Sequence, residues 1–198
     1  MYFGRLLAIF TGFIIFIVLL VVLLGHGGKK PAPLNPIKPL GDYAQTSATV
    51  SFTADGIVNG DEMHRAIRIT VGANRRQLDV LQGYNPQVIL SQSFANNQEA
   101  YTVFLKAIAN NGFVAKLKNS KAPTDERGQC ALGFRYILDL NDGTDDLSRL
   151  WASTCGTAVG NSGGAITTLQ TLFQDQVPSY STLTENVNLS ATTDNQQQ

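Results

Sequence analysis

The chain of 198 residues has few of the side chains on which metal and redox chemistry usually depend, with only two cysteines and two histidines. The cysteines, Cys130 and Cys155, do not form a C-x-x-C pair, and the histidines, His26 and His64, are scattered, so the spacing does not match a usual tetrahedral zinc site. Basic and acidic residues number 15 each, so the formal net charge is zero and nothing indicates a general nucleic-acid binder. We therefore expect no cofactor and no nucleic-acid partner.

Charge is also absent from one long stretch near the amino terminus. No acidic residue precedes Asp42, and residues 6–24 contain no charged side chain at all. A helix of this length spans roughly 28 Å, close to the hydrocarbon thickness of a bilayer. The run exceeds the usual apolar core of a signal peptide, and no A-x-A-like cleavage site follows it. We predict an uncleaved transmembrane anchor that contacts the lipid bilayer.

The rest of the chain divides by composition around this anchor. Residues 1–5 form a short amino terminus, and residues 25–46 form a tether in which four prolines favour an extended backbone. Residues 47–189 form one domain. The polar residues 190–198 have little to bury, which predicts a disordered tail.

Residue periodicity predicts an α+β domain. Apolar and polar residues alternate in 47–54, 67–71, 78–80 and 88–94, which indicates four strands. From Asn97 to Asn111 the apolar spacing becomes helical, and residues 115–129 form a charged loop. Two further strands, 134–140 and 147–154, precede a second helix that begins near Gly164. The expected fold is one mainly antiparallel sheet, in the order ββββαββα, with helices on one face.

The last two strands predict a hairpin closed by a disulfide. Placing Asp142 and Gly143 at the centre of a type I′ turn puts Leu138 opposite Leu147 and Phe134 opposite Trp151. The same register brings Cys130 opposite Cys155. A disulfide here would stabilise the fold by about 3–4 kcal/mol, and it favours an oxidising compartment. The alternative is a pair of unlinked core cysteines.

This disulfide decides the predicted orientation, because Arg5 on one side of the anchor is nearly balanced by Lys29 and Lys30 on the other. With the amino terminus in the cytoplasm, the domain lies outside the cell membrane, where disulfides persist.

Acidic residues gather at the tip of the predicted hairpin: Asp139, Asp142, Asp145 and Asp146. The expected register puts Asp139 opposite Asp146, an unfavourable like-charge pair that a bound Ca²⁺ would relieve. The spacing differs from an EF-hand loop, and a solvated acidic turn explains the same residues. These aspartates are weak candidates for a metal site.

The sequence Gly160-Asn161-Ser162-Gly163-Gly164 resembles the nucleophile loop of trypsin-like serine proteases, particularly the periplasmic HtrA group. The resemblance implies a nucleophilic Ser162, with His64 as the only candidate base and Asp79 as its orienting group. It covers five residues, and the domain is too short for the two barrels of that family. Helical spacing after Gly164 instead favours Ser162 as a helix N-cap. We assign no catalytic residue and keep an envelope hydrolase as a minor alternative.

The amino-terminal apolar helix, antiparallel sheet and late disulfide also resemble the plan of pilins, although pilins place a glutamate just inside the apolar run. A pilus or secretion-system subunit is therefore a further alternative. The leading hypothesis is a membrane-anchored, non-catalytic binding or envelope-structural module with an unidentified protein or envelope partner.

Overall fold

The computed structural model of the chain describes residues 38–156 and 159–190. The predicted amino terminus and anchor, the tether up to residue 37 and the tail from residue 191 lie outside the described residues. Among the residues that are described, no helix has the length and hydropathy required to cross a membrane.

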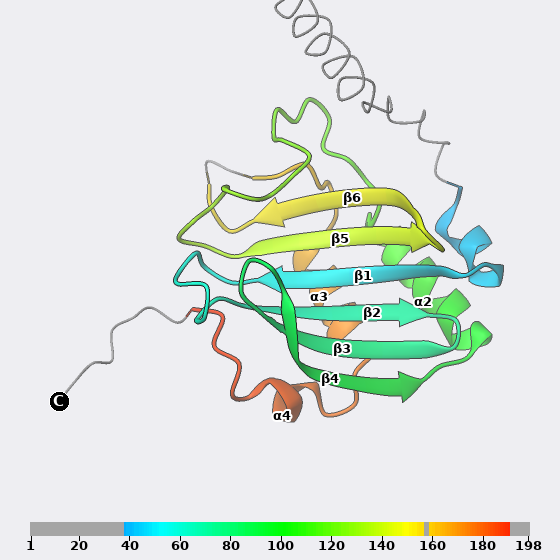
Figure 1. The fold of residues 1–198 in the computed structure, drawn as a ribbon. Coiled ribbons are helices and arrows are strands. Elements are labelled where there is room, and N and C mark those ends of the chain that lie inside the picture. The colour runs from blue at the N-terminus through cyan, green and yellow to red at the C-terminus, as the bar shows by residue number, and fades with distance from the viewer. Residues whose placement is uncertain (1–37, 157–158, 191–198) are drawn as a thin grey trace, which may run out of the picture. The chain divides into compact units, whose positions relative to one another are not determined.

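Six strands form one sheet in which every neighbouring pair is antiparallel (Figure 1). Their order across the sheet is β4-β3-β2-β1-β5-β6. The predicted succession of four strands, a helix, a hairpin and a helix is confirmed. The strands are β1 (Ala48–Asp55), β2 (Arg65–Gly72), β3 (Arg75–Gln82), β4 (Gln87–Ala95), β5 (Arg135–Asp142) and β6 (Asp145–Ser153).

Helices cover one face of this sheet, as expected (Figure 1). Helix α2 (Gln98–Asn110) begins at Asn97, whose side chain accepts a hydrogen bond from the Ala100 amide at 2.9 Å. Helix α3 (Ile166–Gln174) follows the hairpin, and a short α4 (Tyr180–Thr184) completes the set. The N-cap of α3 is Ala165 rather than Ser162, so the predicted capping role of Ser162 is wrong.

The core between sheet and helices is apolar, and Phe173 of α3 lies within it. Its ring centre is 5.6 Å from that of Phe52 on β1, 5.0 Å from Phe104 on α2 and 5.7 Å from Phe113. Phe173 is fully buried. Burial of such apolar surface is the main favourable contribution to folding.

The domain begins earlier than the predicted boundary at residue 47. Leu40–Gln45 forms a 3₁₀ helix, η1, that contacts α2. Leu40, Tyr43 and Ala44 are buried in the core. The apolar residues of this segment outweigh the extended preference of the prolines before it, so the segment after Pro39 belongs to the domain and not to a tether.

The hairpin of β5 and β6 forms, but the predicted register is wrong. Leu138 faces Leu150 instead of Leu147, and Trp151 faces Ile137 instead of Phe134. Two local features cause the shift. The turn lies between Asp142 and Asp145, one residue later than expected, and a bulge follows at the next step of the ladder.

The Cys130–Cys155 disulfide is nevertheless present, with the two Cα atoms 5.5 Å apart. A turn brings Cys130 back toward the end of β6, because the Gly133 amide donates to the Cys130 carbonyl at 3.2 Å. A side chain at Gly133 would clash with Thr154 and lie 2.7 Å from the Cys130 sulfur. The disulfide therefore closes a loop at the base of the hairpin, outside the strand ladder.

Among the described residues, no helix covers the second face of the sheet, and we call it the open face. Two irregular segments border the open face at one end of the strands. They are the loop of residues 115–133 and the hairpin turn between β3 and β4. Figure 1 shows the start of β4 crossing in front of this face.

Candidate functional site

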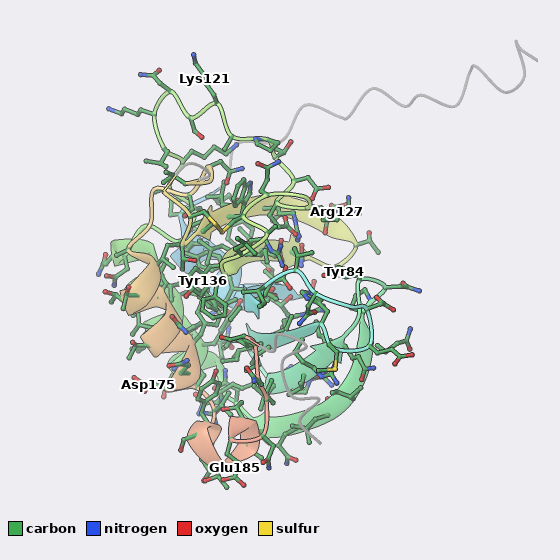
Figure 2. The ribbon with its side chains drawn as sticks, turned by 90° about the vertical axis from the view of Figure 1, so that its left-hand side faces the viewer. Tyr84, Lys121, Arg127, Tyr136, Asp175 and Glu185 are labelled. Atoms are coloured by element: carbon green, nitrogen blue, oxygen red, sulfur yellow. A yellow bond between two sulfur atoms is a disulfide. The ribbon has the colours of Figure 1, made fainter. Side chains whose placement is uncertain are left out.

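A cleft of about 530 Å³ lies on the open face between these two segments. Its floor includes Thr53, Arg68 and Ile137 from three neighbouring strands. Residues 124–127 form one wall, and Tyr84 from the hairpin turn contributes to the other. Figure 2 shows Arg127 and Tyr84 on the side of the molecule away from the helices. We call this hollow the open-face cleft.

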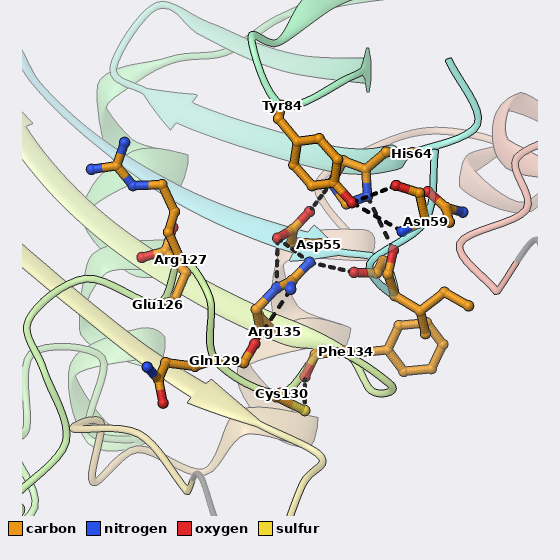
Figure 3. A network of polar contacts seen from close by, with 12 residues as sticks. Asp55, Asn59, His64, Tyr84, Glu126, Arg127, Gln129, Cys130, Phe134 and Arg135 are labelled. Atoms are coloured by element: carbon orange, nitrogen blue, oxygen red, sulfur yellow. Dashed lines mark hydrogen bonds and ion pairs between the residues drawn. The ribbon is translucent and has the colours of Figure 1, made fainter. Parts of the chain in front are cut away.

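Asp55 organises one end of the cleft (Figure 3). One of its carboxylate oxygens lies 2.8 Å from His64 Nε2, and the other lies 2.7 Å from a guanidinium nitrogen of Arg135. The Arg135 side chain also donates to the carbonyls of Gly56 and Gln129. His64 and Arg135 are both buried, so this end of the cleft is a fixed polar cluster.

The His64 ring is held on both sides. Its Nδ1 is 3.1 Å from the Ile57 carbonyl and its Nε2 faces Asp55, so both ring nitrogens meet acceptor oxygens. The Tyr84 ring stacks on the imidazole with the centres 4.3 Å apart, and half of the tyrosine stays exposed. Tyr84 thus provides an aromatic surface at the edge of the cleft.

Arg149 on β6 organises the other end. Its guanidinium lies 2.6 Å from Glu126 Oε1 and 2.9 Å from Asp139 Oδ1. Burial raises the pKa of Asp139, and Arg149 offsets part of this rise. Burial by itself would lower the pKa of Arg149, but the two carboxylates outweigh it and raise that pKa.

Two charged groups here are incompletely paired in the described part of the chain. Glu126 is buried, and its Oε2 atom has no hydrogen-bond partner there. Arg68 is half-buried on the cleft floor, and no ion pair within 4.0 Å forms between it and the described residues. Its charge contributes only at longer range, to the pKa of Asp139. The cleft therefore offers both an acceptor and several donors.

The residues of the protease-like hypothesis do not come together. His64 contacts Asp55, whereas Asp79 accepts hydrogen bonds from Gln77 and Ser91. Ser162 is buried beside β6, where its hydroxyl accepts a hydrogen bond from the Gly164 amide. The three residues belong to three separate sets of contacts.

The glycine-rich motif has a packing role instead. Gly160 pairs with Ala152 of β6 and has a φ of +94°. A side chain at this position would collide with the Trp151 carbonyl and the Ala152 backbone. The amides of Asn161 and Ser162 donate to the same Trp151 carbonyl at 2.9 Å. The motif lets this segment lie flat along the edge of the sheet.

The acidic hairpin tip also differs from its expected arrangement. Asp139 faces Arg149 and not Asp146, so the like-charge pair that motivated the calcium hypothesis does not form. Asp142 faces Asp145 across the turn and accepts a hydrogen bond from the Ser47 hydroxyl at 2.7 Å. Within residues 38–156 and 159–190, no group of three or more His, Cys, Asp or Glu side chains is arranged to hold a metal.

Sequence reasoning missed most of the cleft. Of its residues, only His64 and Asp139 were singled out, each for a different role. Arg68 did carry a signal, because it is the charged residue on the polar side of an alternating strand. Glu126 carried none, since nothing in a charged loop shows which side chain folds back and becomes buried.

No protein-family model matches the chain, and no curated protein or solved structure matches it.

Proposed function

We propose that the chain is a membrane-tethered binding module of the extracytoplasmic space, and that its open-face cleft holds a polar ligand rich in hydroxyl groups. The observation that carries the proposal is the incomplete pairing of charged groups in the cleft. A hydroxyl group can accept a hydrogen bond from Arg68 and donate one to a carboxylate.

The lining of the cleft favours this ligand class over an apolar one. Pockets for drug-like ligands are mostly apolar with few polar groups. The open-face cleft has charged side chains on its floor and on the wall formed by residues 124–127. Its half-exposed aromatic ring, Tyr84, is suited to stacking against the apolar side of a sugar ring. A glycan of the cell envelope presents both kinds of surface.

The location is supported by two features of the chain. The Cys130–Cys155 disulfide favours an oxidising compartment, and the apolar run of residues 6–24 has the length of a single membrane span. The proposed arrangement has the amino terminus inside the cell membrane and the domain outside.

A binding titration of the full-length protein in detergent tests the ligand class. The probes are a panel of neutral oligosaccharides and a matched panel of short peptides, and the readout is the fluorescence of Trp151, the one tryptophan of the chain. Its indole donates to the Pro123 carbonyl in the loop that forms a cleft wall. We expect a saturable change with an oligosaccharide and none with the peptides.

Substitution of Arg68 localises the binding. Arg68→Met keeps the apolar stem but removes a charged donor, which should weaken binding by about tenfold or more. Arg75→Met is the matched control, because Arg75 is exposed and outside the cleft. Equal binding by the two variants, or a response to peptides alone, would contradict the proposal.

A further inference from the structure

The two edges of the sheet differ in how they are protected. At one edge, β6 carries Asp145, Asp146 and Arg149, and residues 160–162 pair with its second half. Charged side chains and covering loops are the usual means by which an edge strand is kept from pairing with another chain. The β6 edge has both.

Within the described residues, the opposite edge, β4, has neither protection along most of its length. Its nine residues include no charged residue and no proline, and all except Phe94 are exposed. A bulge at Ile89 bends the start of the strand over the open face. At the other end of the strand, the Arg76 side chain donates hydrogen bonds to the Ala95 carbonyl. In the described structure, the segment between them, Leu90–Phe94, has no partner strand on its outer side. We call this segment the free edge.

We propose that the free edges of two copies of this chain pair antiparallel across a two-fold axis and form a dimer with one continuous sheet. In such an antiparallel pairing both copies use the same surface, so the segment needs to be complementary only to itself. The absence of charge matters here, because a charged residue near the axis would meet its own copy. The proposed membrane tether would hold both copies in one plane and raise their effective concentration.

The asymmetry of the two edges also sets the size of the assembly. Once the two β4 strands have paired, the outer edges of the joined sheet are both β6, each carrying its charges and covering loop. No unprotected edge is left for a third copy. The assembly therefore closes as a dimer and does not grow into a fibre.

Sedimentation of the full-length protein in detergent micelles tests the proposal. We expect a dimer for the natural sequence and, for Gln92→Lys, a dissociation constant raised on the order of tenfold or more, because two lysines would face each other near the axis. Gln92 is exposed in the middle of the free edge. Thr168→Lys is the control, because Thr168 is an exposed, neutral residue on α3.

A crosslinking experiment separates pairing at the free edge from association through the membrane segment. Gln92→Cys and Thr168→Cys proteins are treated in membranes with a short bis-maleimide. We expect a crosslinked dimer with Gln92→Cys and little with Thr168→Cys. A monomer in sedimentation, an equal response to both lysine variants, equal crosslinking at both cysteines, or larger oligomers would each overturn the proposal. A circular dichroism spectrum that matches that of the natural protein confirms that Gln92→Lys is folded.

Discussion

The two faces of the sheet are buried by different means. Helices cover one face, where Val50, Phe52 and Leu138 are almost completely inaccessible. On the open face, polar side chains such as Ser51, Thr53 and Asp79 are also buried. Apolar burial stabilises without specifying an orientation, whereas buried polar groups must find particular partners. The helical face therefore provides stability, and in the proposed function the open face provides recognition.

The largest expected effect comes from the helical face. Phe173→Ala removes a ring that contacts three other phenylalanine rings, and should lower the free energy of unfolding by about 3–5 kcal/mol. Chemical denaturation measures the loss. At a temperature where the variant is still folded, its oligosaccharide affinity should match that of the natural protein. A weaker affinity would show that the two faces are not independent.

The disulfide stabilises the segment that borders the open face. Replacing both Cys130 and Cys155 by serine should lower the unfolding free energy by about 3–4 kcal/mol, because the crosslink restricts a loop in the unfolded chain. The natural protein measured in a reducing agent provides the control and should lose the same amount. A loss of less than about 1 kcal/mol would mean that the unfolded chain is already restricted there.

The helical face and the β5–β6 hairpin also show what the sequence could and could not predict. The buried faces of α2 and β1 followed from local spacing, and so did the order of elements. The β5–β6 register depended on which two residues form the turn and on the position of one bulge. The alternation of apolar and polar residues determines neither of them. The disulfide was predicted correctly from a wrong register, because the turn at Cys130 compensates for the shift.

The open-face cleft was beyond local reasoning for a different reason. Arg68, Asp139 and Arg149 line one cleft because β1 lies between β2 and β5, and this pairing of distant segments has no local signal. Glu126 reaches Arg149 from a loop without regular structure. Helical spacing reveals a core, but only the tertiary fold reveals which charged side chains share a cleft.

A smaller effect is expected from the charged cluster. Arg149→Met leaves Glu126 buried without its cation, and should lower the unfolding free energy by about 1–2 kcal/mol, less than for a fully buried pair because Arg149 is half exposed. Arg127→Met, at an exposed pair with Asp125, is the control and should cause no measurable change. Adding Glu126→Gln to Arg149→Met should recover part of the loss, since the unpaired charge is removed. Equal losses for the two single variants would argue against a special role of the cluster.

The smallest effect tests a polar group within the helical face itself. The fully buried Tyr101 donates a hydrogen bond to the Ala48 carbonyl at 2.8 Å, so Tyr101→Phe should lower the unfolding free energy by about 1 kcal/mol at neutral pH. Burial, together with the negative charge of Asp142, raises the pKa of Tyr101 above its usual value near 10. Ionisation is therefore easier in the unfolded chain, and the stability present below pH 10 is lost as the pH rises beyond it. Denaturation between pH 8 and about pH 11 should show this loss in the natural protein and a shallower one in Tyr101→Phe, so that the two curves converge. Parallel curves would mean that the phenol ionises as easily in the folded protein as in the unfolded chain.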